Sequence, residues 1–526
     1  MTTFTRRSLI AGATAGAALT VVGCTGSGAG NDAPPRVDPK SNGVFTRTPD
    51  ANVTVPDADG AIGVSKALLS AATAVVVAPA PGAAAQPAAS ASPSPSRTAT
   101  RTPAASASPS AAPGGDDKAK LAASVAKALG VPMFYDSPAL AAELDRLQTR
   151  TVISYGPDAH GRERVEGPAS ADNLPQLPGL PRKPDANAQL VLTDGEPEPA
   201  TAATLAAAGV TPLVLHSGHP GETKTSVEKV KADTKPIVAV GTAFGSVAAF
   251  DVKLDVARTA AELPGGGVTP FPGRRMIALY GHPGTAALGM MGEQPPAQAV
   301  GRVKEYVDEY QALLKDDTII GAFEIITTVA SGFPGKDGTY SFKTPQEQIL
   351  PWIEEAERSG LYCVLDLQPG RTDFLTQAKL YADLLKRPWV GLALDPEWRL
   401  KPNQKHLQQI GQVGVDEINT VGAWLADFVK ENKLPPKVLT LHQFQSRMIV
   451  GRDRLDTSRD EIQYLVHADG QGTQPMKQDT WGVLKKGLPA NVYLGWKNFV
   501  DEDKPMLTPK QTVDQVHPTP YFVSYQ

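Results

Sequence analysis

The chain contains very little cysteine: Cys24 and Cys363 are the only two among 526 residues. A framework of several disulfides is therefore excluded. An excess of charge of one sign is also missing, since the formal net charge is −4. A nucleic-acid partner would require a basic surface, so we expect none. The hydrophobic fraction of 41% and the charged fraction of 20% are ordinary for a soluble globular protein.

Long hydrophobic runs are scarce as well. The apolar run Leu9–Val22 is too short to predict a membrane span with assurance. It follows Arg6-Arg7 and leads into Val21-Val22-Gly23-Cys24, a pattern that resembles a bacterial lipoprotein signal peptide of the twin-arginine type, residues 1–23. This resemblance implies that Cys24 becomes the lipidated N-terminus of the mature protein and anchors it to the outer face of the cell membrane. An ordinary secretory signal with a chance cysteine is the alternative.

Lipidation of Cys24 would leave Cys363 alone, so an intramolecular disulfide would be impossible. Because Cys363 stands in an apolar strand pattern, we expect a small buried residue and not a nucleophile.

Composition divides the remainder of the chain. Residues 24–51, rich in Gly, Ser, Asp and Pro, predict a flexible tether. Residues 52–245 alternate short apolar strands with Ala-rich helices, and residues 79–117, almost wholly Ala, Pro, Ser, Gly and Thr, form a low-complexity insertion in this region. Residues 246–273, with three consecutive glycines and several prolines, predict a linker to a second domain, residues 274–526.

The region 52–245 contains an internal repeat. Leu129-Gly130-Val131-Pro132 and Ala208-Gly209-Val210-Thr211 occupy matching places, each followed by a helix and by an apolar strand ending in Gly156 or Gly241. This order resembles the cell wall-binding repeat 2 family, flavodoxin-like modules that hold anionic wall polymers on Gram-positive surfaces. The resemblance implies tandem flavodoxin-like α/β units and a cell-wall partner. Generic small α/β units are the alternative. A nucleotide site is not expected, because no phosphate-binding glycine fingerprint follows these strands.

The second domain has the rhythm of a (β/α)8 barrel. Helical segments fill most of the gaps between its apolar strands. Eight strands are predicted, at Met276–Gly281, Ile320–Ile326, Leu361–Leu367, Val390–Leu394, Val438–Phe444, Ile462–His467, Val492–Trp496 and Tyr521–Tyr525.

Active sites of such barrels lie at the C-terminal ends of the strands, and here nearly every strand ends in a titratable or aromatic residue. Strand alternation puts Asp366, Asp395 and Glu397 on inward faces together with small residues. The catalytic candidates are Glu397, Asp395 and Asp366. The substrate-binding candidates are Tyr280, His282, Glu324, Gln368, Trp398, His442, His467, Asp469, Trp496 and Tyr525.

The stretch Leu394-Asp395-Pro396-Glu397-Trp398 resembles the Asp-x-Glu that ends strand four of barrel muramidases and chitinase-like hydrolases. The resemblance implies a glycoside hydrolase-like activity, with Glu397 as general acid, Asp395 as its partner and Asp366 as an electrostatic stabiliser. Tyr280, Trp398 and Trp496 would stack on sugar rings. The structural alternative is that Asp395-Pro396 only ends the strand while Glu397 pairs with Arg399 or Lys401.

Other chemistries fit less well. His442 and His467 match the strand-five and strand-six histidines of metal-dependent barrel hydrolases. Strand one, however, lacks their His-x-His and strand eight lacks an acid, so we expect no metal and no cofactor. A serine esterase is excluded because no nucleophile elbow is present. Two hypotheses remain: a lipid-anchored envelope lipoprotein whose barrel cleaves a glycan, or one that binds an envelope glycan or other ligand without cleaving it.

Overall fold

The computed structural model describes residues 43–82, 115–156, 158–180 and 184–526. Cys24, the signal peptide and most of the low-complexity insertion lie outside these residues.

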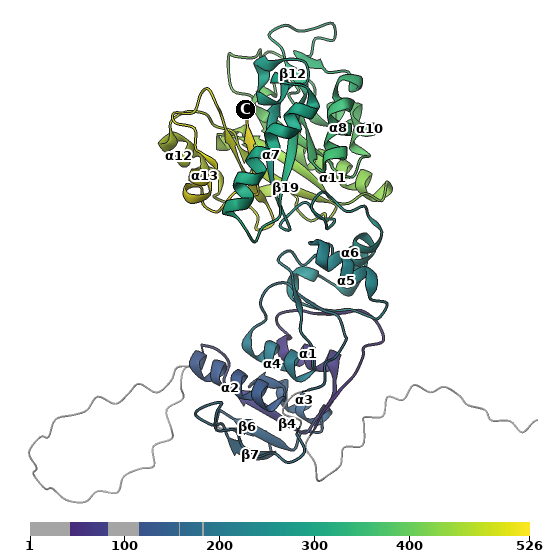
Figure 1. Cartoon of the computed structure of the whole chain (residues 1–526), viewed down its shortest axis with the longest axis vertical. Helices are drawn as coiled ribbons and strands as arrows, with labels where there is room; N and C mark the ends of the chain where they lie inside the picture. Colours follow the sequence, from purple (N-terminus) through teal and green to yellow (C-terminus); the bar gives the residue numbers. More distant parts are fainter. Residues whose placement is uncertain (1–42, 83–114, 157, 181–183) are drawn as a thin grey trace, which may run out of the picture. The chain divides into compact units, whose positions relative to one another are not determined.

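The C-terminal region is a closed barrel of eight parallel strands, as the sequence predicted (Figure 1). Strand β11 pairs in parallel with both β12 and β21, which closes the sheet. The barrel strands are β11 (Arg275–Gly281), β12 (Ile319–Ala330), β14 (Tyr362–Leu367), β15 (Val390–Leu394), β17 (Lys437–Gln443), β19 (Ile462–Ala468), β20 (Tyr493–Asn498) and β21 (Phe522–Tyr525). A short strand, β13 (Ser341–Lys343), adds to the far end of β12 in antiparallel orientation.

Helices surround the barrel and return the chain from the end of one strand to the start of the next (Figure 1). They are α7 (Pro296–Leu313), α8 (Gln346–Ser359), α9 (Phe374–Leu380), α10 (Ala382–Leu385), α11 (Val415–Glu431), α12 (Gln474–Leu484) and α13 (Pro509–Gln515). The connection from β17 to β19 is irregular, with the 3-10 turns η5 (Ser446–Met448) and η6 (Arg452–Arg454) around the short β18 (Ile449–Val450). The closed all-parallel sheet with its outer helices is the architecture of a TIM barrel.

Strand alternation divides the barrel core into two parts, as the sequence predicted. Outward side chains such as Leu279, Phe323 and Leu392 pack against the helices in one large apolar cluster. Inward side chains of the lower barrel form a separate, smaller cluster that includes Ala278 and Ala393. Apolar groups therefore fill the interior nearer the N-terminal ends of the strands, and inward polar groups gather at the C-terminal ends.

The N-terminal region contains two four-stranded parallel sheets. The first has the order β5-β4-β6-β7 and the second the order β2-β10-β8-β9. Their strands are β2 (Val53–Val55), β4 (Ala74–Ala78), β5 (Met133–Tyr135), β6 (Thr151–Ser154), β7 (Glu163–Glu166), β8 (Val191–Thr193), β9 (Leu213–Val214) and β10 (Val238–Val240). The helices are α1 (Gly60–Leu68), α2 (Gly115–Leu129), α3 (Leu140–Arg146), α4 (Pro199–Ala207) and α5 (Lys224–Ala232).

Two segments expected to be irregular contain regular structure. The predicted linker 246–273 includes helix α6 (Val247–Thr259), whose N-terminus is capped by the Ser246 side chain. Its buried residues Phe250, Leu254 and Ala257 recur at helical spacing. The glycines and prolines of the segment had suggested a linker in spite of this spacing. The end of the predicted tether forms strand β1 (Val44–Thr46), which pairs antiparallel with β3 (Leu69–Ala72).

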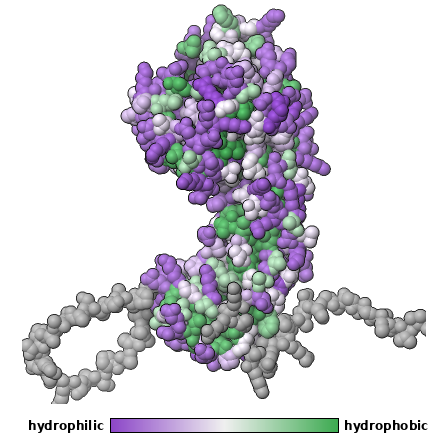
Figure 2. All heavy atoms as spheres, in the orientation of Figure 1, coloured by the Kyte–Doolittle hydropathy of each residue, from purple (hydrophilic) through white to green (hydrophobic). Residues whose placement is uncertain are grey.

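Within the described residues, no helix combines the length and apolar character needed to cross a membrane. On the visible face of the barrel, hydrophilic side chains predominate and hydrophobic ones are scattered among them (Figure 2).

Candidate functional site

A cluster of polar side chains fills the C-terminal end of the barrel, and each of the eight strands supplies one member, which for β15 is the residue that directly follows the strand. Parallel strands all end at the same side of the sheet, so their last inward side chains meet there. We call these residues the polar cluster: Tyr280, Glu324, Asp366, Asp395, His442, His467, Lys497 and Ser524, together with Asp469 from the turn after β19. Its acids Glu324, Asp366 and Asp395 are 0%, 0% and 1% exposed.

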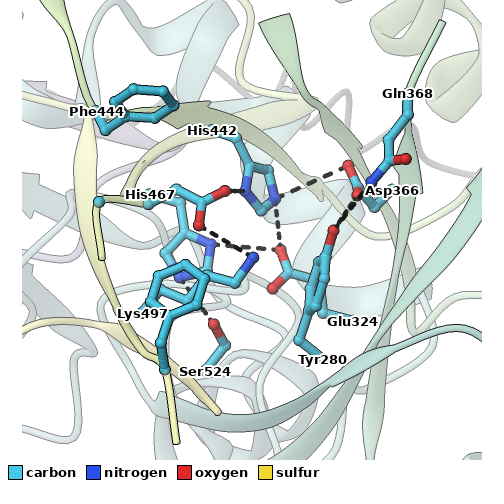
Figure 3. Close-up of polar contacts among 12 residues, drawn as sticks. Tyr280, Glu324, Asp366, Gln368, His442, Phe444, His467, Lys497 and Ser524 are labelled. Atoms are coloured by element: carbon cyan, nitrogen blue, oxygen red, sulfur yellow. Dashed lines mark hydrogen bonds and ion pairs between the residues drawn. The ribbon is translucent and has the colours of Figure 1, made fainter. Parts of the chain in front are cut away.

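His442 is held between two acids (Figure 3). Its Nδ1 lies 2.7 Å from Oδ2 of Asp469, and its Nε2 lies 3.0 Å from Oε1 of Glu324. The same Glu324 oxygen lies 3.4 Å from Nδ1 of His467. The other ring nitrogen of His467, Nε2, is 3.1 Å from the Ser524 hydroxyl. Both histidines therefore point one nitrogen toward Glu324 and hold the other with a polar partner.

A second set of contacts joins Tyr280 to the cluster (Figure 3). The Tyr280 hydroxyl donates a hydrogen bond of 2.8 Å to Oδ2 of Asp366, and the Gln368 amide lies 3.4 Å from that hydroxyl. The Lys497 ammonium lies 3.4 Å from the centre of the Tyr280 ring and 3.1 Å from Oδ1 of Asp469. Lys497 therefore makes both a cation–π contact with Tyr280 and a buried ion pair with Asp469.

Charged neighbours set the pKa values at the base of the cluster. Burial alone would raise the pKa of Asp469, but Lys497 and His442 lower it below its usual value. Burial likewise opposes ionisation of Glu324, but its two histidine neighbours lower its pKa. The pKa of His442 is raised well above its usual value, because Glu324, Asp366 and Asp469 outweigh its burial. Asp469 and Glu324 are therefore the two acids of the cluster whose pKa values are lowered.

The other three acids hold protons more tightly. Burial is the main cause in each case, and neighbouring carboxylates add to it. The pKa of Asp366 is raised to about 6, and that of Asp395 well above its usual value. The pKa of Glu397 is raised to about 7, first by burial and then by Asp469, while Lys497 acts in the opposite direction. The site therefore combines ionised and protonated carboxyl groups at neutral pH.

Glu397 differs from the other acids in its access to solvent. It lies in the 3-10 turn η4 (Pro396–Trp398) that follows β15, and its side chain is only partly buried. Among the described residues, its carboxylate makes neither a hydrogen bond nor an ion pair with another side chain. Arg399, one of the two bases named in the structural alternative, is instead bound to Glu417, with its Nε 3.0 Å from Oε1.

Glu397 and Gln368 lie beside the polar cluster, and four other predicted site residues lie outside it. Trp496 is on the outer face of the sheet, where its ring packs edge-to-face on Trp481 of α12. Tyr525 also faces outward, with its hydroxyl 3.0 Å from that of Tyr310 in α7. Both alternate with inward neighbours, so neither reaches a sugar bound at the site.

The remaining two are closer to the rim. His282 is bound to the Thr344 hydroxyl at 2.9 Å and accepts from the backbone N–H of Gly284. Trp398 is half-buried, with its ring beside that of His406.

Lys497 and Ser524 belong to the cluster but were not among the predicted site residues. Alternation could have found both, because each is an inward polar residue near the end of its strand. The neighbouring aromatic residues Trp496 and Tyr525 were predicted as substrate-binding residues in their place.

The arrangement supplies what acid–base chemistry requires: a partly accessible acid above a buried set of charges. It also contains two groups of three side chains whose ligand atoms lie close enough to hold one metal ion, Glu324 with His442 and His467, and Asp395 with His442 and Asp469. No protein-family model matches the chain, and no curated protein sequence is significantly similar to it.

Proposed function

We propose that the barrel is a glycoside hydrolase-like enzyme in which Glu397 is the general acid. The observation that carries this proposal is the state of Glu397: partly exposed, free of an ion-pair partner, and with a pKa raised to about 7. A protonated carboxyl at neutral pH is the group that glycosidic bond cleavage needs at the leaving oxygen. The Asp395-Pro396-Glu397 sequence at the end of β15 supports the same role.

The buried acids act on the substrate through Glu397 and through their charge. Asp395 raises no charge of its own at neutral pH, since its pKa lies well above its usual value. Its carboxyl therefore adds no second negative charge beside Glu397, and we assign it as the partner of that acid. Asp366 lies one strand away, and its carboxylate contributes negative charge that stabilises an oxocarbenium-like transition state. Gln368 and Tyr280 position that carboxylate.

The proposed cellular setting is the outside of the cell membrane. The Arg6-Arg7 and Cys24 pattern supports export and lipidation of Cys24, which would hold the protein at the membrane. We further propose that region 52–245 consists of tandem flavodoxin-like units that bind a cell-wall polymer. Its internal repeat and its two four-stranded parallel sheets support this assignment. The substrate would then be a cell-wall or envelope glycan.

A second function is favoured by one observation. Asp366 and Asp395 are 0% and 1% exposed, so Glu397 is the one catalytic candidate that a polymer reaches directly. One accessible acid is sufficient for a barrel that binds an envelope glycan or another ligand without cleaving it.

The test incubates the purified full-length protein with purified cell wall. It measures reducing ends in the supernatant and protein sedimenting with the wall. The hydrolase proposal expects release of reducing ends by the wild type and by Glu431→Gln, an exposed acid at the end of α11, but not by Glu397→Gln. Sedimentation of all three proteins without release by any would support the binding function instead. Release by Glu397→Gln at the wild-type rate would refute the role of Glu397.

A further inference from the structure

We propose that Glu324, His442 and His467 bind a divalent transition-metal ion, for which Zn²⁺ is the probe. The site lies within the polar cluster, and one ligand atom from each residue lies within 4.8 Å of the other two. The inference goes beyond the proposed function, because it does not require that the barrel cleave a glycan. It also departs from the expectation, drawn from the sequence, that no metal is bound.

The separations of the ligand atoms fit a single coordination sphere. Bonds of 2.0–2.2 Å to one ion place neighbouring ligand atoms roughly 2.8–3.6 Å apart, for angles between a right angle and the tetrahedral angle. The Glu324 Oε1 atom lies 3.0 Å from Nε2 of His442 and 3.4 Å from Nδ1 of His467. An ion can therefore bind with little movement of the three side chains.

The second ring nitrogen of each histidine has the partner that a metal ligand needs. When Nδ1–H of His442 donates to Asp469 at 2.7 Å, the lone pair of Nε2 faces Glu324. When Nε2–H of His467 donates to the Ser524 hydroxyl at 3.1 Å, the lone pair of Nδ1 faces the same point. Carboxylate or hydroxyl partners of this kind fix the tautomer and the ring orientation of histidines that bind metals. Figure 3 shows both rings directed toward Glu324.

Several buried atoms at this point have no hydrogen-bond partner among the described residues. They include Oε2 of Glu324, Nδ1 of His467 and Oδ1 of Asp366, all on side chains that are 0% exposed. Buried polar atoms are normally satisfied, so atoms left over at one place indicate a missing ligand. The Asp366 oxygen lies 3.9 Å from Nε2 of His442 and faces the same space.

The charges of the cluster favour a cation as that ligand. The cluster buries four acids together: Glu324, Asp366, Asp395 and Asp469. Among the described residues, Lys497 is the one buried lysine whose ammonium forms an ion pair with any of these acids. Buried acids in such excess require a proton or a metal ion for charge balance. Two imidazole nitrogens and one carboxylate select a first-row transition ion over Mg²⁺ or Ca²⁺, which prefer oxygen ligands.

The second group, Asp395 with His442 and Asp469, is a poorer site. The 2.7 Å between Nδ1 of His442 and Oδ2 of Asp469 is the length of a hydrogen bond and is shorter than the separation of two ligands on one ion. Asp469 is also bound to Lys497 at 3.1 Å. We therefore assign Asp469 to the support of His442 and not to the metal.

The test uses full-length protein freed of metal by a chelator and titrated with ZnCl₂ in a calorimeter, with MgCl₂ as the comparison. We expect about one Zn²⁺ per chain for the wild type and no stoichiometric Mg²⁺ binding. The variants His467→Gln and Glu324→Gln should lose stoichiometric binding. His517→Gln, an exposed histidine after α13, should bind as the wild type does. Circular dichroism checks that each variant is folded.

A milder variant guards against loss of fold. Ser524→Ala keeps the three ligands and the Lys497–Asp469 ion pair, and should weaken Zn²⁺ binding about 10- to 100-fold, the usual effect of removing the partner of a ligating histidine. With Co²⁺ in place of Zn²⁺, visible absorption bands should appear in the wild type and change in His467→Gln. A wild type that binds no Zn²⁺, or a folded His467→Gln variant that binds it unchanged, would overturn the proposal. Because both readouts are independent of glycan cleavage, either proposal can fail without the other.

Discussion

Arg399 binds Glu417 of α11, with its Nε 3.0 Å from Oε1, and leaves Glu397 without a basic partner two residues earlier in the chain. The Arg399 guanidinium also donates to the backbone carbonyl of Leu400 at 2.8 Å, which fixes the turn after η4. The base that could have neutralised the acid instead holds the loop that carries it. A carboxyl left unpaired beside a buried acidic cluster has a raised pKa, which is the property on which the proposed chemistry depends.

The pH dependence of cleavage should follow the protonation of Glu397. A general acid works only while it carries its proton, and the pKa of Glu397 is raised to about 7. The rate of release of reducing ends should therefore fall as the pH rises through about 7. The measurement is the initial rate between about pH 5 and pH 9, with Glu431→Gln as a control that keeps the same profile. A rate that continues to rise above neutral pH would argue against an acid role.

Replacement of Lys497 should destabilise the barrel strongly. Its ion pair with Asp469 has side-chain exposures of 2% and 5%, so Lys497→Met removes the ammonium partner of a buried carboxylate and leaves it only the contact with His442, at a cost of about 3–5 kcal/mol. The matched control is Lys386→Met, whose partner Asp383 is on the surface; that pair is 55% and 75% exposed and is worth about 0–1 kcal/mol. Tryptophan fluorescence in a urea titration reports the barrel, because all six tryptophans lie between residues 352 and 496. Equal effects of the two substitutions would contradict this account of the cluster.

Gly391 should be intolerant of a side chain. A Cβ there would lie 2.8 Å from the carbonyl oxygen of Val438 and 3.1 Å from the Tyr362 hydroxyl, inside the barrel. We expect Gly391→Ala to lower the free energy of unfolding by about 1–3 kcal/mol through overpacking. Gly482→Ala is the comparison, since no atom lies within 4 Å of its added Cβ in helix α12; it should stabilise by about 0.4–1 kcal/mol. Urea denaturation measures both, and a neutral Gly391→Ala would mean that the interior is loosely packed.

The barrel was largely predictable, because its signal is repeated eight times. Each strand is a buried apolar run followed by a polar or glycine-containing turn, and alternation placed Glu324, Asp366 and Asp395 inside. Helix α6 was missed because glycines and prolines on its C-terminal side suggested a linker, although its apolar spacing is helical. Short strands such as β7 and β13 have no strong pattern of their own and form by pairing with a neighbour.

The site was predictable as a collection of residues but not as a network. Sequence spacing relates neighbours on one strand, whereas Glu324 on β12 meets His442 on β17 and His467 on β19, neither of which pairs with β12 in the sheet. Such contacts across the barrel interior depend on its diameter and on side-chain length. The outward positions of Trp496 and Tyr525 follow from alternation alone, once Lys497 and Ser524 are taken as inward.

The most direct measurement of the central claim is the rate at which Glu397→Gln releases reducing ends from purified cell wall, relative to the wild type and to Glu431→Gln. Glutamine keeps the size of the side chain but cannot donate the proton. We expect the Glu397→Gln rate to fall by about 10²- to 10⁴-fold, with Glu431→Gln unchanged and the circular dichroism of all three proteins the same. A Glu397→Gln protein that releases reducing ends as fast as the wild type would contradict the account.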